Sequence, residues 1–209
     1  MKQHVRDESD ERVIHRLESF SDIVIGFSLA QMGLSFTVPQ RAIEIFAKPY
    51  GIIAFFITFI IVARVWWSHH KLFTHFFVPN RLTIVLNFTT LAVLLFAVYS
   101  VQVLVHTKFA DTIAVLMYLC SFGTLFALLG TQYVYGWRRR RSELPADVAD
   151  AGVRNGTVSI VMGLAFIAGA VAMGVFGLSV NALFVVVLVP AVLGRILRSV
   201  WQRSQHRPA

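Results

Sequence analysis

Residues 16–39 read RLESFSDIVIGFSLAQMGLSFTVP, a stretch that is charged up to Asp22 and uncharged from there to its final proline. Ser21 and Asp22 stand at the edge of the apolar run, and Ser28 and Gln31 lie inside it. Lipid tails offer no hydrogen bonds, so polar groups within a membrane normally face protein or a water-filled path. This stretch therefore predicts a membrane helix that carries the function, with the remaining helices holding it in place.

The composition is that of an integral membrane protein. Of the 209 residues, 56% are hydrophobic and only 14% are charged, and the mean hydropathy is +0.68. A soluble domain of this size needs a more highly charged surface. The net charge of +8 could suggest nucleic acid, but the basic residues lie between apolar runs. That pattern favours the anionic inner leaflet as their partner and predicts no nucleic-acid binding.

Six apolar stretches each approach the ~20 residues that a membrane-spanning helix needs. We therefore predict an all-α polytopic membrane protein in which residues 1–209 form a single six-helix subunit. The predicted transmembrane helices lie at 20–38, 50–68, 82–105, 112–135, 156–178 and 181–199. Residues 138–156, RRRRSELPADVADAGVRNG, are predicted to form a loop outside the bilayer. The last two spans are predicted to form a tight antiparallel hairpin.

The basic residues outside the spans gather on one predicted side of the membrane. With the N-terminus in the cytosol, the opposite side carries only Arg41, Lys48 and Lys108. This distribution follows the positive-inside rule and predicts a multi-pass protein of the cell inner membrane with both termini cytosolic. The run Arg138–Arg141 flanks a span, so we expect anionic lipids around it.

The first span has one side-chain stripe that could form part of a site. On a helix with about 100° between residues, the stripe consists of Ile23, Phe27, Ala30 or Gln31, and Leu34. Ordinary helix packing is one interpretation. The other is a pore lining, in which bulky apolar side chains narrow a water path and gate it by dewetting. Asp22 fits a cytosolic vestibule or a helix-locking hydrogen bond, and periodicity alone leaves these alternatives open.

The second span ends in ARVWWSHHKLFTHF, residues 63–76, with two tryptophans at the level of an interfacial aromatic belt. His69, His70 and His75 permit a metal hypothesis. Adjacent histidines point about 100° apart on a helix, and no cysteine or carboxylate completes a set nearby, so we predict hydrogen-bonded anchors and no metal site. Arg64 falls within the span, where we expect it to reach the cytosolic face; pairing with Asp22 is the alternative.

Two motifs in the first third of the chain resemble a known family. Arg16-Leu-Glu-Ser-Phe20-Ser21-Asp22 matches an RxxxFSD signature, and residues 55–73, FFITFIIVARVWWSHHKLF, are similar to an aromatic-rich second helix that ends in Trp and a His pair. Both belong to the transmembrane-protein-175 family of potassium channels, which comprises the lysosomal channel and its prokaryotic relatives. The chain resembles a prokaryotic six-helix member.

The resemblance implies a homotetramer whose first helices line a central pore, without a TVGYG-type filter. The family's apolar constriction falls on Phe27, and positions further along the pore fall on Ala30, Gln31 and Leu34. The motif residues would form a structural network that ties the first helix to its neighbours: Arg16, Phe20, Ser21 and Asp22, with Trp67 and His70 as partners. Relatives commonly have Leu or Ile at the constriction and often Thr three residues later. Phe27 and Ala30 depart from this pattern, so the resemblance implies a cation channel and leaves its selectivity for potassium over sodium open.

These observations predict a potassium-conducting cation channel with a hydrophobic gate. Its permeant ions would be potassium, and it would have no cofactor. Nothing in the sequence resembles a nucleophile with its base, a phosphate-binding loop or a pair of carboxylates, so we predict neither an enzyme nor catalytic residues. Two alternatives remain open. One is a proton-coupled secondary transporter or exchanger that uses Asp22 and the membrane-edge histidines as titrating groups, and the other is a non-conducting scaffold.

Overall fold

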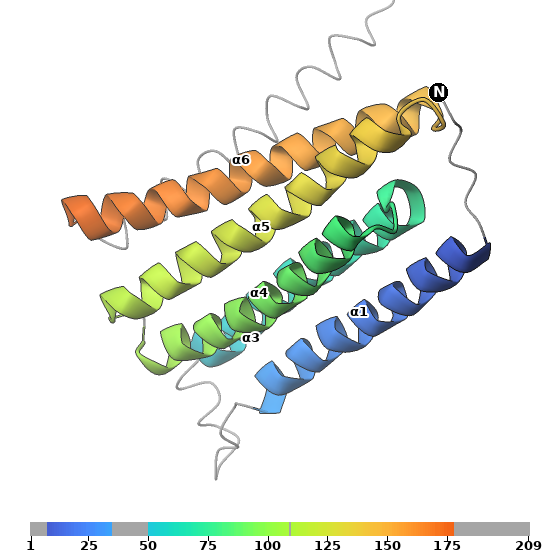
Figure 1. The fold of residues 1–209 in the computed structure, drawn as a ribbon. Coiled ribbons are helices and arrows are strands. Elements are labelled where there is room, and N and C mark those ends of the chain that lie inside the picture. The colour runs from blue at the N-terminus through green and yellow to red at the C-terminus, as the bar shows by residue number, and fades with distance from the viewer. Residues whose placement is uncertain (1–7, 35–49, 109, 178–209) are drawn as a thin grey trace, which may run out of the picture.

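The structure is a computed structural model that describes residues 8–34, 50–108 and 110–177, and these residues form helices and short connections. The helices are α1 (Glu8–Leu34), α3 (Tyr50–Lys71), α4 (Arg81–His106), α5 (Thr112–Arg140) and α6 (Ala146–Phe176), with a π-helical turn, η1 (Leu72–Phe76), that continues α3. They lie alongside one another, with α3 and α4 between α1 and the α5–α6 pair (Figure 1). The predicted all-α class is confirmed for the described part of the chain.

Three of the described helices, α4, α5 and α6, are long and apolar enough to cross a membrane. They correspond to the third, fourth and fifth predicted spans. Helices α1 and α3 contain the described part of the first span, residues 20–34, and the second span, 50–68. The sixth predicted span, 181–199, lies outside the described residues, and so does most of the turn that was predicted to join it to the fifth span in a hairpin. Within the described part, α6 ends at Gly177, whose φ of 63° forms a left-handed C-cap.

The loop predicted between the fourth and fifth spans is much shorter in the structure. Helix α5 continues through Arg140 and α6 begins at Ala146, so only residues 141–145 connect them. Arginines in a last helical turn interact favourably with the helix dipole, and a proline at a helix start loses no intrahelical hydrogen bond. The prediction of a long loop was therefore wrong because charge alone does not end a helix that extends beyond the apolar region.

Glycines bring the backbones of α5 and α6 into direct contact. Gly123 and Gly130 lie seven residues apart on α5, and Gly156 and Gly163 have the same spacing on α6. A Cβ added at Gly163 would lie 2.6 Å from the carbonyl oxygen of Gly123, and one added at Gly130 would lie 2.6 Å from the carbonyl oxygen of Gly156. Small residues at a membrane helix interface permit this close approach, so the pair forms a tight unit.

The turn after α3 is fixed to α5 and to the start of α4. The Phe76 ring packs against Tyr133, with ring centroids 5.4 Å apart. Asn80 caps α4, because its side-chain Oδ1 accepts a hydrogen bond from the Thr83 amide at 3.1 Å, and the Asn80 amide donates to Thr83 Oγ1 at 3.1 Å. These contacts set the position of α4 and of Asn87, two turns further along that helix.

Candidate functional site

Helix α1 has two faces with opposite environments. Its buried residues recur at heptad-like spacing along the side that packs on α3 and α4: Ile14, Ser21, Ile25, Ser28 and Met32. The opposite side carries the residues of the predicted stripe. Ile23 is 70% exposed, Phe27 63% and Leu34 86%, and Ala30 and Gln31 are also exposed. Within the described part of the chain, one side of α1 is therefore packed against α3 and α4 and the other side is uncovered.

The buried face of α1 is joined to two other helices by a chain of hydrogen bonds. The Ser21 hydroxyl on α1 donates to the Leu17 carbonyl at 2.7 Å and accepts from Asn87 Nδ2 on α4 at 3.2 Å. Asn87 Oδ1 in turn lies 2.8 Å from Nε2 of His69 on α3. All three side chains are almost fully buried. Buried polar groups are costly unless they are paired, so this chain fixes α1 relative to α3 and α4.

The direction of these hydrogen bonds assigns the tautomer of His69. The Ser21 hydrogen is used at the Leu17 carbonyl, so the Ser21 oxygen must accept from the Asn87 amide nitrogen. Asn87 therefore presents its oxygen to His69, and Nε2 of the ring carries the hydrogen. Nδ1 of His69 is buried and has no hydrogen-bond partner among the described residues. His69 acts here as a donor to Asn87, in the anchoring role predicted for this histidine group.

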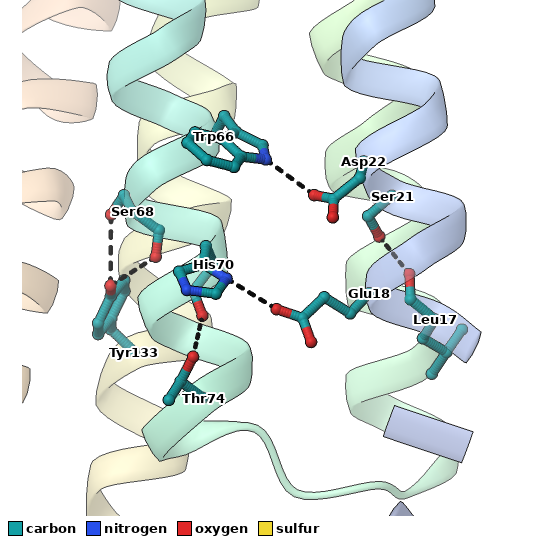
Figure 2. Close-up of polar contacts among 9 residues, drawn as sticks. All are labelled: Leu17, Glu18, Ser21, Asp22, Trp66, Ser68, His70, Thr74 and Tyr133. Atoms are coloured by element: carbon teal, nitrogen blue, oxygen red, sulfur yellow. Dashed lines mark hydrogen bonds and ion pairs between the residues drawn. The ribbon is translucent and has the colours of Figure 1, made fainter. Parts of the chain in front are cut away.

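Two further polar contacts join α1 to the end of α3 (Figure 2). The indole Nε1 of Trp66 donates to Asp22 Oδ1 at 2.8 Å. His70 Nδ1 lies 2.9 Å from Glu18 Oε1, where it forms an ion pair when the ring is protonated. Glu18 and Asp22 are four residues apart, so both carboxylates project from the same side of α1 toward α3. These contacts hold α1 near its polar end, before the apolar stripe begins.

The structure gives different partners from those proposed for the motif residues. Asp22 is bonded to Trp66, whereas the neighbouring Trp67 lies beneath the Lys71 ammonium, 5.1 Å from its ring centroid. Glu18, the partner of His70, was not among the candidate residues. Asn87, which lies between Ser21 and His69, is a further member of this network from outside the two motifs. Trp66 and Trp67 point about 100° apart around the helix. Which of them faces Asp22 depends on how α3 is rotated, and the spacing of residues in the sequence does not give that rotation.

The remaining motif residues make weaker contacts. Phe20 packs edge-on against Phe88 of α4, with ring centroids 5.7 Å apart. Arg16 is exposed. Arg64 is also exposed on α3, and the hydrogen bond to Asp22 comes from Trp66 rather than from this arginine. Within the described residues, no three His, Cys, Asp or Glu side chains come together as metal ligands would.

Helix α5 is tied to the same part of the bundle. The Tyr133 hydroxyl donates to the Ser68 carbonyl at 2.6 Å, a contact shown in Figure 2. One turn along α4 from Asn87, Thr90 Oγ1 accepts from Gln132 Nε2 at 2.8 Å. The polar contacts thus run from α1 through α3 and α4 to α5, and they give α1 a rigid support on its buried side.

A family model described as the endosomal/lysosomal potassium channel TMEM175 matches residues 16–97. That region holds both sequence motifs and the helices that carry the Ser21–Asn87–His69 chain. A potassium channel of Marivirga tractuosa is 32% identical over 89 residues, which is 43% of this chain and 36% of the relative. The aligned chain thus spans about a third of that relative's length.

A solved structure has the same fold. The potassium channel MtTMEM175, solved as a variant in complex with a nanobody–MBP fusion protein, is similar with a TM-score of 0.61. The alignment covers 88% of this chain and 93% of that chain at 20% sequence identity. Together with the three apolar helices of spanning length, these findings indicate a multi-pass membrane protein.

Proposed function

We propose that the chain is a pore-forming subunit of a potassium-conducting cation channel of the transmembrane-protein-175 family, with α1 lining the ion path. The matched family and the relative from Marivirga tractuosa both carry potassium-channel names, which favours a channel over the proton-coupled transporter. The observation that carries the proposal is the division of α1 into a buried face, which hydrogen bonds join to α3 and α4, and an exposed apolar stripe.

The uncovered stripe meets the requirements of a pore wall. Four of its members, Ile23, Phe27, Ala30 and Leu34, follow steps of four, three and four residues, so they lie along one line on the helix. An added Cβ at Gly26 or Gly33 would meet nothing within 4 Å. This side of α1 therefore has room for other copies of the same helix around a common axis.

An exposed apolar surface on α3 suits contacts with neighbouring subunits. On α3, Phe56 is 59% exposed and Ile60 is 67% exposed, and they lie four residues apart on one side of the helix. In a homotetramer with the α1 stripes at the centre, side chains of this kind can pack against the next subunit. The proposed assembly thus uses an exposed apolar surface on α1 and another on α3.

Ion passage through this pore would be a physical step with no cofactor. Phe27 forms the narrowest apolar ring, and a water path that narrow loses its water and closes. Gln31, one turn further along, supplies amide dipoles that can partly replace the hydration shell of an ion. The hydrogen bonds of Ser21 and Asp22 would keep the four α1 helices in register below the ring.

Potassium efflux from liposomes that contain the purified full chain tests this function. For a channel we expect little net efflux until a protonophore supplies a compensating charge movement, and then efflux well above that of protein-free liposomes. The reason is that channel flux is electrogenic and needs no co-substrate. Efflux that proceeds equally without the protonophore would identify an electroneutral exchanger. Absence of efflux in both conditions would leave a scaffold and would refute the proposal.

A further inference from the structure

We propose that the arginine-rich end of the α5–α6 pair binds anionic phospholipids, with Arg139 and Arg141 on nearly opposite sides of the helix end, each holding the phosphodiester group of one lipid. The neighbouring Arg140 would be a structural residue and not part of this surface. The sequence presents the four arginines as a uniform run. The structure gives them different contacts, and the proposal rests on that difference.

The charge of Arg140 is engaged within the protein. Its Nε lies 3.3 Å from Glu143 Oε2, and its Nη1 donates to the His75 carbonyl at 2.5 Å. Its side chain is only 19% exposed. This arginine therefore joins the end of α5 to the π-helical turn after α3, and few of its donors remain for an outside ligand.

Arg139 and Arg141 are held differently. The guanidinium carbon of Arg139 lies 5.5 Å from the centroid of the Tyr135 ring, and that of Arg141 lies 5.5 Å from the centroid of the Trp137 ring. Each pair is separated by four residues on α5, so each ring supports one flat face of a guanidinium. Both arginines are exposed, and no carboxylate among the described residues pairs with either side chain.

The rings place these arginines at the depth of lipid headgroups. Helix α5 is one of the helices with the length and apolarity to cross a membrane, and tyrosine and tryptophan are typical of the interface at the end of such helices. A guanidinium stacked on Tyr135 or Trp137 keeps its edge donors in the headgroup layer. Its planar fork matches the two oxygens of a phosphodiester.

The local charge also favours an anion. Exposed Arg138 and Arg154 add to the two stacked arginines, and Arg154 lies two residues before Gly156, which packs beside Tyr133 and Val134 of α5. The carboxylates at this end of the pair are Glu143, Asp147 and Asp150. The arginines outnumber them, and Glu143 is already paired with Arg140.

Lipid binding to the full chain in neutral detergent tests this proposal. Native mass spectrometry would compare retention of phosphatidylglycerol with retention of phosphatidylcholine, and we expect the unmodified chain to prefer phosphatidylglycerol. Removal of a basic residue at an anionic membrane surface lowers affinity about fivefold. Arg139→Gln combined with Arg141→Gln should therefore lower the phosphatidylglycerol affinity at each of the two positions about fivefold.

Two single variants separate this surface from a general effect of charge. Arg81→Gln removes one positive charge from the start of α4, and Arg140→Gln removes the paired arginine. Both should retain the lipid preference, and Arg140→Gln should instead lower the melting temperature. If the double variant fails to fold, Arg139→Lys with Arg141→Lys keeps the charge and removes the planar fork, and we expect it to lose part of the preference.

Several results would overturn the proposal. The first is that the unmodified chain shows no preference for phosphatidylglycerol. The second is that the lysine variant or the double glutamine variant keeps the full preference. The third is that Arg81→Gln loses as much phosphatidylglycerol affinity as the double glutamine variant. Competition with inorganic phosphate provides a further control, because it is a phosphate anion without a lipid attached. Displacement of phosphatidylglycerol by millimolar inorganic phosphate would show that the surface binds free phosphate and would refute the lipid assignment. Mass spectrometry measures the bound lipid and requires no ion flux, so the result is independent of channel function.

Discussion

Replacement of Phe27 by alanine is expected to raise potassium flux through the protein about tenfold, which corresponds to a barrier lower by about 1.4 kcal/mol. Phe27 is 63% exposed on the uncovered side of α1, so its replacement removes little buried surface from the described part of the subunit. In the proposed pore, four phenyl rings exclude water from the narrowest level. Alanine would widen that level and allow it to stay hydrated.

A matched substitution on another helix controls for general loosening of the bundle. Phe96 of α4 is 48% exposed and packs beside Tyr99, so Phe96→Ala removes the same ring from a different exposed surface. We expect potassium flux in Phe96→Ala to stay at the level of the unmodified chain. The measurement is initial efflux from liposomes at equal protein content. Unchanged flux in both Phe27→Ala and Leu34→Ala would contradict the assignment of the pore lining.

Addition of a single methyl group at Gly163 is expected to destabilise the bundle by about 1–3 kcal/mol, the usual cost of overpacking. A Cβ at this position would lie 2.6 Å from the Gly123 carbonyl oxygen and 2.7 Å from the Ala127 amide nitrogen. Both neighbours are backbone atoms, which cannot move aside as a flexible side chain can. The α5–α6 pair would have to separate, and the contacts of Tyr133 and Gln132 with α3 and α4 would weaken with it.

Gly174 provides the control on the same helix. A Cβ there would meet nothing within 4 Å, so Gly174→Ala should leave the stability unchanged or raise it slightly through helix propensity. Thermal melts of the two variants in the same detergent test the difference, since both gain the same methyl group and the same propensity. Equal melting temperatures for Gly163→Ala and Gly174→Ala would show that the close approach of α5 and α6 is not required for stability.

The sequence predicted the helical class, because it follows from long apolar runs. It also grouped Ile23, Phe27 and Leu34 into one stripe, but the burial of Ser21, Ile25, Ser28 and Met32 on one opposite face was not predicted. The exposure of Phe27 and Leu34 in the subunit agrees with their place on the predicted stripe. Whether that stripe faces water, lipid or another subunit depends on how subunits assemble, and the periodicity of the sequence carries no information about the assembly. The pore lining is therefore still a proposal.

The partners of individual polar residues could not be predicted in the same way. The bond from Trp66 to Asp22, in place of Trp67, depends on the rotation of α3 against α1. The link from Ser21 through Asn87 to His69 requires three helices to meet at one depth. The glycines of α5 and α6 are small residues of the kind that permit close helix contacts in membranes, but spacing alone does not identify such a contact, because Gly26 and Gly33 have the same seven-residue spacing and a Cβ at either would meet nothing within 4 Å.

The central claim is that one side of α1 faces a water-filled ion path and the other faces protein. Cysteine modification tests it most directly, with Cys120→Ser removing the native thiol. Ala30 is exposed and Ser28 is fully buried, they lie on nearly opposite sides of the helix, and cysteine resembles both in size. A charged thiol reagent should abolish most of the potassium flux in Ala30→Cys and leave Ser28→Cys unchanged. Block of Ser28→Cys with no effect on Ala30→Cys would contradict the account.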